Sequence, residues 1–220
     1  MRQRNELQTS DLETQSPNTG PTYTEWRHQV RNGLKPLQKA LVPLFRETQL
    51  FRVYSSTLVP GLLQTEGYAS AVLKVVADFR ELPYDDSAEA ARARVERSQV
   101  VHEPGRQFVL LIEESVLYHQ IGDTDTMAAQ LSYLLTVGDL PSVSLGIIPA
   151  ATPERAQWPR ETFHMYDDKL ASIELVSASV NVNQPSEIAL YLKTFEQLSS
   201  MALYGAEARA LTLKALEALR

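Results

Sequence analysis

Two short apolar stretches separated by a helical one constrain the fold more than any other feature of this sequence. "QFVLLIEE" (107–114) and "SVSLGIIP" (142–149) are rich in aliphatic residues over the length of one strand, which is typical of strands buried on both faces. Between them, "TDTMAAQLSYLLTVGD" (124–139) repeats apolar residues at the helical period. A strand, a helix and a second strand in this order predict a right-handed crossover between parallel strands.

The N-terminal half is predicted to be helical but interrupted. Apolar residues follow the helical period over residues 26–45, yet Pro36 and Pro43 lie inside that pattern and each removes a backbone donor. We therefore expect two or three short helical pieces in this region. One further helix is predicted over residues 66–76, and another begins at Ser87, its predicted cap.

The C-terminal half completes the sheet and adds two helices. "TFHMYDDKLASIELV" (162–176) predicts a hairpin with a tight turn, and "ASVNVN" (178–183) adds one short strand. One amphipathic helix begins near Pro185, and Gly205 separates it from a last helix that ends at Arg220. The fold class predicted for the chain is α+β (mixed α/β), with a helical N-terminal half, a mixed sheet of four to five strands and two C-terminal helices.

The chain divides into a leader and one domain. Residues 1–21 are polar and contain few apolar side chains, so we expect them to be a disordered leader. At 44% hydrophobic content a chain of this length can bury one sizeable core, or two small ones, without metals or disulfides, and we expect residues 22–220 to form a single domain.

Several kinds of chemistry are excluded or disfavoured by residue type and spacing. The chain has no cysteine, which excludes disulfides, thiolate nucleophiles, iron–sulfur clusters and cysteine-bound zinc. The histidines lack the i, i+4 spacing that places two metal ligands on one helical face; they are His28, His102, His119 and His164. No GxSxG motif and no phosphate-binding glycine loop occurs. We expect no metal and no cofactor, and a binding domain is a stronger expectation than an enzyme.

Charge and hydropathy limit the partners. The 21 basic and 27 acidic side chains give a net charge of −6, which disfavours approach to a phosphate backbone. No stretch approaches the roughly 20 apolar residues that span a bilayer, and the N-terminus lacks the apolar core of a signal peptide. We expect no direct contact with nucleic acid or membrane, and a cytoplasmic location.

The stretch "TPERAQWPRETF" (152–163) places a tryptophan among charged residues, between a predicted buried strand and the hairpin. In one interpretation Trp158 covers the edge of the sheet, while Arg155, Arg160 and Glu161 are solvated or pair locally. In the other, the arginines and the tryptophan line a ligand pocket or a partner groove. Guanidinium and indole groups suit that second role, because they recognise anions, stack on planar groups and dominate interface energetics.

The stretch "VPGLLQT" (59–65) leaves the same two alternatives. Gln64 can contact a ligand, or the stretch is a turn in which Thr65 caps the next helix and no ligand is needed. Glu174, in the second strand of the hairpin, is a further candidate. The full candidate set for ligand or partner binding is Arg155, Trp158, Arg160, Glu161, Gln64 and Glu174.

Several motifs occur together in an order that resembles a known family. They are "LVPGLLQTEGYASAVL", "RARVERSQ", "IEESVL" and the long stretch that begins "IPAATPERAQWPRETFHMYDDKLASIELV". Together they resemble the C-terminal domain of unknown function of actinobacterial helix-turn-helix regulators of the XRE type, which are described as antitoxin-like. The resemblance covers residues 23–220. In such regulators a helix-turn-helix precedes this domain, and residues 1–21 resemble no such module.

The resemblance implies a stand-alone regulatory sensor or protein-interaction domain that binds a small molecule or a partner protein and does not bind DNA by itself. One alternative is a small enzyme of specialised metabolism that reuses the fold, with Arg155, Glu161, Tyr166 and Glu174 as conceivable site groups. Another alternative is a structural subunit that pairs with a full-length regulator.

The two C-terminal helices also bear on oligomeric state. Each carries an apolar stripe: Ile188, Phe195 and Leu198 on the first, and Leu211, Ala215 and Leu219 on the second. One stripe must face the sheet. If the other is left uncovered, a two-fold pair of chains buries it, and we expect a homodimer on this basis.

Overall fold

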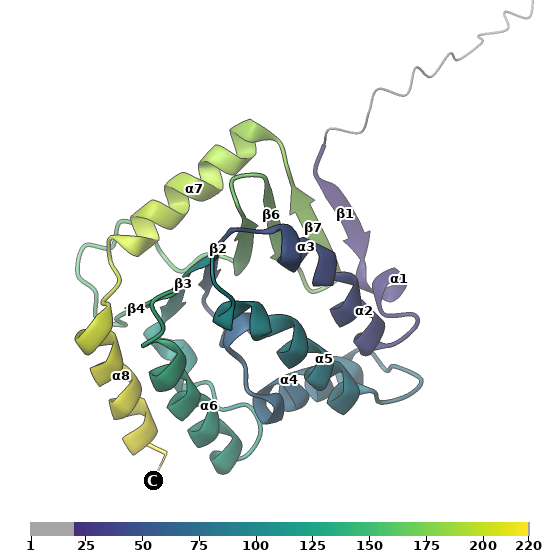
Figure 1. The fold of residues 1–220 in the computed structure, drawn as a ribbon, viewed down its shortest axis with the longest axis horizontal. Coiled ribbons are helices and arrows are strands. Elements are labelled where there is room, and N and C mark those ends of the chain that lie inside the picture. The colour runs from purple at the N-terminus through teal and green to yellow at the C-terminus, as the bar shows by residue number, and fades with distance from the viewer. Residues whose placement is uncertain (1–19, 220) are drawn as a thin grey trace, which may run out of the picture.

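The structure, a computed structural model, describes residues 20–219. The leader predicted over residues 1–21 lies outside the described residues except for its last two. The strands are β1 (Thr22–Glu25), β2 (Leu50–Ser55), β3 (Gln107–Glu113), β4 (Val143–Ile148), β5 (Phe163–Tyr166), β6 (Leu170–Glu174) and β7 (Ala178–Val182). They form one seven-stranded sheet in the order β1-β7-β6-β5-β2-β3-β4 (Figure 1).

The sheet has a parallel and an antiparallel part. β2, β3 and β4 are parallel neighbours, which confirms the predicted crossover between β3 and β4. β5 pairs antiparallel with β2, and β6, β7 and β1 continue the antiparallel part as predicted for the hairpin and the strand after it. The mixed α+β class is therefore confirmed, with more strands than the four or five predicted.

The two additional strands are β1 and β2, and each lacks a clear local signal. β1 is a short edge strand with two exposed residues, and its sequence "TYTE" directly precedes the first helical turn. β2 lies inside the sheet, but Arg52 interrupts its apolar pattern and only five residues separate it from the turn at Gly61. Both become strands through pairing with distant segments.

The helices follow the predicted pattern closely. The α-helices are α1 (Trp26–Gln29), α2 (Leu34–Ala40), α3 (Val42–Glu47), α4 (Glu66–Phe79), α5 (Ser87–Ser98), α6 (Thr124–Val137), α7 (Pro185–Ser199) and α8 (Gly205–Glu217), and the 3-10 turns are η1 (Gly61–Leu63), η2 (Gln99–His102) and η3 (Glu114–Tyr118). The predicted interruption is confirmed as the three pieces α1, α2 and α3. Pro36 and Pro43 lie in the first turns of α2 and α3, where a missing backbone donor costs little.

The helix caps confirm one prediction and correct another. Thr65 caps α4, because its hydroxyl accepts a hydrogen bond from the backbone N–H of Tyr68. Ser87 was predicted to cap α5, but the N-cap position is Asp86. The Asp86 carboxylate instead accepts the backbone N–H groups of Leu34 and Lys35, so it ties the start of α5 to the start of α2.

Helices cover both faces of the sheet. α7 packs on one face, where Ile188, Phe195 and Leu198 meet Phe163 and other strand residues. α3, α4, α6 and α8 contribute to a larger core on the opposite face. α8 lies beside α6 (Figure 1) and buries Ala208 and Ala215 in that core. The apolar stripes of α7 and α8 are therefore both buried within one chain. The homodimer stays a prediction, but an uncovered stripe no longer supports it.

None of the helices in residues 20–219 combines the length and the apolar character needed to span a bilayer.

Candidate functional site

The carboxyl ends of the three parallel strands meet beneath the loop that joins β4 to β5. An open cavity of about 320 Å³ lies there, lined by Ser56, Glu113, Ser115, Ala150, Arg155 and Pro159. Ser56 follows β2, Glu113 ends β3, and Ala150 lies two residues beyond β4. In open sheets with parallel strands, ligands commonly bind at this edge. The loop of residues 149–162 thus lies at one end of the sheet, as predicted from the sequence.

A buried ion pair fixes this loop to the sheet. Glu113 is only 5% exposed, and its carboxylate accepts two hydrogen bonds from Arg155, at 2.6 Å from Nη2 and 3.1 Å from Nη1. The Tyr54 hydroxyl donates a third hydrogen bond to Glu113 at 2.9 Å. Arg155 Nε also donates to the carbonyl oxygen of Gln157 at 2.9 Å. A buried carboxylate is tolerated when it is paired and hydrogen-bonded in this way.

Tyr54 extends the network to the other end of the loop. Its hydroxyl accepts the backbone N–H of Arg160 at 3.2 Å while it donates to Glu113. Burial of the phenol, and next the hydrogen bond to the Glu113 carboxylate, raise the pKa of Tyr54 well above its ordinary value. The tyrosine is therefore a neutral hydrogen-bond donor at physiological pH, and it holds Glu113 and the loop backbone together.

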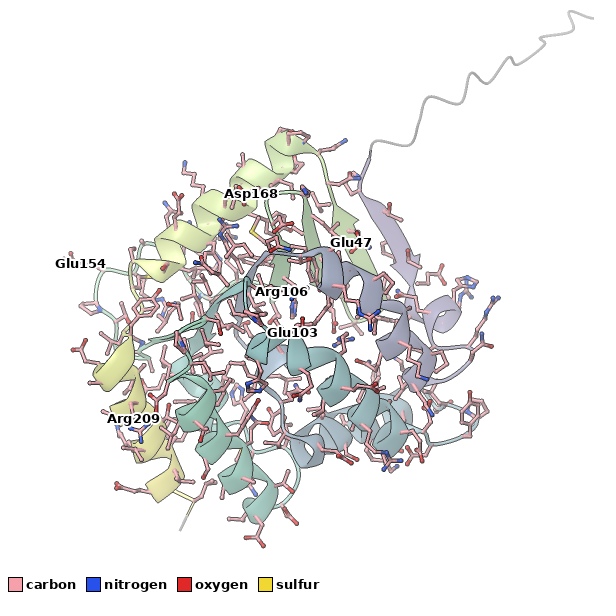
Figure 2. All side chains as sticks on the ribbon, viewed as in Figure 1. Glu47, Glu103, Arg106, Glu154, Asp168 and Arg209 are labelled. Carbon is pink, nitrogen blue, oxygen red and sulfur yellow. The ribbon has the colours of Figure 1, made fainter. Side chains whose placement is uncertain are left out.

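The tryptophan of the loop faces solvent. Trp158 is 63% exposed, and the Arg160 guanidinium carbon lies 4.4 Å from the centroid of its ring. Trp158 is therefore not buried at the sheet edge, whereas the local pairing of charges in that interpretation is found for Arg155 with Glu113. Glu161 is exposed as well, and Figure 2 shows Glu154 projecting from the same loop at the outer edge of the molecule. The loop therefore exposes an aromatic ring and charged groups to solvent, while the ion pair between Arg155 and Glu113 holds it to the sheet.

The hydrogen-bonding groups around the cavity are largely paired within the protein. Three Arg155 donors are used within the protein, and the Glu113 carboxylate accepts from both Arg155 and Tyr54. The Ser56 hydroxyl donates to the carbonyl oxygen of Arg160, which fixes its orientation. The groups that line the cavity are therefore held in place by internal hydrogen bonds, and the exposed Trp158 ring lies in the same loop.

Two of the predicted residues do not join this site. Gln64 is 5% exposed and lies away from the loop, beside helix α5. Its Oε1 accepts a hydrogen bond from Arg94 Nη1 at 2.7 Å. Its Nε2 donates to the carbonyl oxygen of Val59 at 2.7 Å. Glu174 is exposed at the end of β6, and its negative charge opposes the decrease in the pKa of Arg94 that burial causes. The predicted set therefore divides into a loop group and a pair of residues near Arg94.

Tyr166, named for the enzyme alternative, is a core residue. It is 7% exposed and packs against Phe45 and Phe51. Burial is the main cause that raises its pKa to about 12. It does not contact the loop that carries Arg155 and Glu161.

A cluster of basic groups beside Gln64 was missed by the sequence analysis. Gln38 Oε1 accepts from both Arg94 Nε and Arg97 Nη1, each at 3.1 Å. Arg97 is 8% exposed, and its guanidinium carbon lies 4.4 Å from the ring centroid of Phe45. Burial, and next the charge of Arg94, lower the pKa of Arg97 to about 10.

His164 on β5 is the third basic residue of this region. Burial is the largest cause that lowers its pKa to about 4, and the charges of Arg97 and Arg94 lower it further. One signal in the sequence could have indicated the arginines. Arg94 and Arg97 are three residues apart on an alanine-rich helix, and this spacing places them on the same side.

Within residues 20–219, no three His, Asp or Glu side chains come together as a metal ion requires. The expectations of no metal and no cofactor stay predictions.

The sequence matches DUF5753, a domain of unknown function, over residues 38–214. The chain belongs to the DUF5753 family. The matched residues include the loop site and the arginine cluster, whereas β1 and α1 precede them. No curated protein matches this DUF5753 chain.

Solved structures resemble the DUF5753 chain only distantly. The archaeal chromatin protein TrmBL2 is 12% identical with a TM-score of 0.39, covering 88% of this chain and 57% of its own. A phospholipase D family member, Nuc from Salmonella typhimurium, is 11% identical with a TM-score of 0.43, covering 84% of this chain and 97% of its own. NucT from Helicobacter pylori is 7% identical with a TM-score of 0.43, covering 84% and 98%. The DUF5753 chain thus spans little more than half of TrmBL2.

Proposed function

We propose that this DUF5753 domain is a regulatory sensor or protein-interaction domain that recognises a small molecule or a partner segment at the loop of residues 149–162. The observation that carries the proposal is the exposed Trp158 ring, stacked by Arg160 above a loop that a buried ion pair fixes. Tryptophan and arginine are the residues that most often dominate binding energy at interfaces. A loop held in place before binding loses little conformational entropy when it binds.

The two arginines of the loop have different roles in this proposal. Arg155 is a positioning residue, because its guanidinium is already bound to Glu113 and to the backbone of Gln157. Arg160 and Trp158 make the contact, because the indole ring remains mostly accessible.

The resemblance to the C-terminal domains of XRE-type regulators supports a regulatory role for such a surface. In that role the domain reads a signal and does not contact DNA by itself. A cytoplasmic location is part of the same proposal.

Native mass spectrometry of the purified full-length chain tests the proposal. We expect the wild type to retain a small molecule, or to form a complex with the partner regulator, and Trp158→Ala to lose it. Phe79→Ala is the matched control, because Phe79 is 68% exposed and lies on α4, away from the loop. Retention by Trp158→Ala as strong as by the wild type would contradict the proposal.

The same experiment separates the alternatives. Turnover of a retained compound by the wild type would favour the enzyme that reuses this fold. A stable complex with a full-length regulator that does not respond to Trp158→Ala would favour the structural subunit.

A further inference from the structure

One face of the sheet changes from apolar to polar between its parallel and antiparallel parts. Over β2 and β3 this face carries Val53 and Leu110, which are at most 1% exposed and belong to the large core. Strand register places His164 opposite Val53, Ser172 opposite His164, and Asn181 opposite Ser172. The three polar residues form a row across β5, β6 and β7, and each retains some solvent-accessible surface. This row is therefore polar, although Tyr166 on the same face of β5 still belongs to the large core.

Two guanidinium groups of α5, those of Arg94 and Arg97, lie near the His164 end of this row. Arg97 lies over the Phe45 ring, and Phe45 packs against Tyr166, which shares a face of β5 with His164. The positive charges of Arg94 and Arg97 both disfavour the protonated form of His164. Their hydrogen-bond partners on the protein are the uncharged groups of Gln38 and Gln64. Both amide side chains are at least 95% buried, so they fix the arginines in place.

Negative charge is scarce around these arginines. In the part of the chain that the structure describes, neither Arg94 nor Arg97 forms an ion pair with a carboxylate. Glu174 acts on both through its charge, but it is exposed and does not contact them within ion-pair distance. Two neighbouring guanidiniums removed from bulk water are costly unless an anion compensates them.

One donor of the pair has no acceptor. Arg97 is 92% buried, and its Nε atom lacks a hydrogen-bond partner among the described residues. A buried N–H without a partner is unfavourable, and native proteins seldom leave one in that state. The protein therefore leaves the hydrogen-bonding capacity of this arginine partly unfilled.

We propose that Arg94, Arg97 and His164 form a second binding site, separate from the loop, for a small oxyanion that carries a carboxylate or phosphate group. Guanidinium groups bind the paired oxygen atoms of both groups through parallel hydrogen bonds. The polar row of the sheet provides further hydrogen-bonding groups for the body of such a ligand. The site does not depend on the function proposed for the loop.

Isothermal titration calorimetry with the full-length chain tests this site. The probes are inorganic phosphate and succinate, with sodium chloride at matched ionic strength as the reference. We expect saturable binding of at least one probe with a Kd below about 1 mM, and a higher affinity for phosphate than for succinate would indicate a phosphate ligand. The absence of binding by either probe to the wild type would overturn the proposal.

Variants on the same helix assign the binding to the arginine pair. Arg97→Gln should lower the affinity at least about tenfold, as loss of one charge-assisted hydrogen bond predicts. Arg92→Gln is the matched control, because Arg92 is an exposed arginine of α5 that pairs with Glu89 and Glu66. Equal loss in both variants would mean that the anion binds through general surface charge, and the proposal would be wrong.

A measurement on the wild type guards against a variant that fails to fold. In nuclear magnetic resonance spectra, the His164 ring signals should move saturably with the probe, while those of exposed His28 should follow only the salt reference. Trp158→Ala should leave these changes unaltered, so that failure at the loop and failure at the arginine pair are distinguishable. His164 signals that do not respond to a bound probe would also contradict the proposal.

Discussion

Residues three positions apart in one loop have opposite environments. Arg155 is mostly buried against Glu113, whereas Trp158 exposes most of its ring. The difference follows from their partners, because the Arg155 guanidinium pairs with a buried carboxylate, while the Trp158 ring stacks with the side chain of Arg160. The side chain that supports the loop and the side chain available for recognition are therefore different residues.

Removal of the Trp158 ring should affect stability only slightly. We expect Trp158→Ala to lower the free energy of unfolding by less than about 1.5 kcal/mol, because emptying a core aromatic site costs about 3–5 kcal/mol and this ring is not in the core. Phe163→Ala is the comparison, since Phe163 is 0% exposed and packs against Tyr54 and Tyr191. Urea unfolding of both variants measures the difference. A core-sized loss from Trp158→Ala would show that the ring stabilises the fold.

His164 should make stability depend on pH. Its pKa is about 4 in the folded protein against an ordinary value of 6.5, so the unfolded chain binds more protons between these values. Stability should therefore fall as the pH decreases from 6.5 to 4, by at most about 3 kcal/mol for this group.

His164→Gln removes the titrating group and supplies the control. The difference in unfolding free energy between wild type and His164→Gln, measured by urea unfolding across that pH range, isolates the histidine from the carboxyl groups that also titrate there. A difference that does not change with pH would contradict this prediction.

At the level of secondary-structure elements, the β4–β5 loop depends on the ion pair between Glu113 at the end of β3 and Arg155. Arg155→Met removes the pairing group and leaves a carboxylate that is 5% exposed with only Tyr54 as a side-chain partner. We expect a loss of about 3–5 kcal/mol in unfolding free energy, as found when one partner of a buried pair is removed. The double variant Glu113→Gln with Arg155→Met should recover part of this loss, because it no longer buries an unpaired charge.

An exposed ion pair provides the control for this prediction. Arg52 on β2 and Asp168 in the β5–β6 turn form an ion pair at 2.7 Å, in which the Asp168 side chain is 63% exposed. Asp168→Asn should change stability by less than about 1 kcal/mol, the usual range for surface pairs. If Arg155→Met cost no more than Asp168→Asn, the buried pair would not be what holds the loop.

For the whole molecule, the balance of charge predicts weak interaction with DNA. The net charge of −6 opposes a phosphate backbone, so we expect no specific complex between the purified chain and duplex DNA. A gel-shift titration at about 150 mM salt checks this, since non-specific binding there has a Kd of only about 10⁻⁴–10⁻⁶ M. A discrete complex at nanomolar protein would show that the chain contains a DNA-binding surface.

Much of the architecture could be predicted from local sequence patterns. The periodicity of the apolar residues indicated the helices, and the prolines at positions 36 and 43 indicated the breaks between α1, α2 and α3. The order of strand, helix and strand indicated the parallel pairing of β3 with β4. It also placed the loop of Trp158 at an end of the sheet. These features are set by interactions between residues close together in the chain, so local sequence patterns are sufficient to predict them.

Only the tertiary structure decided which distant residues meet. β2 is a strand because it pairs with β3 and β5, and Glu113 finds Arg155 across 42 positions of the chain. Gln64, a candidate in the sequence, belongs with Arg94 instead of with the loop. The polar row of the sheet exists because strand register places His164 beside Ser172. Register and packing arise from contacts between segments far apart in sequence, and local periodicity carries no record of them.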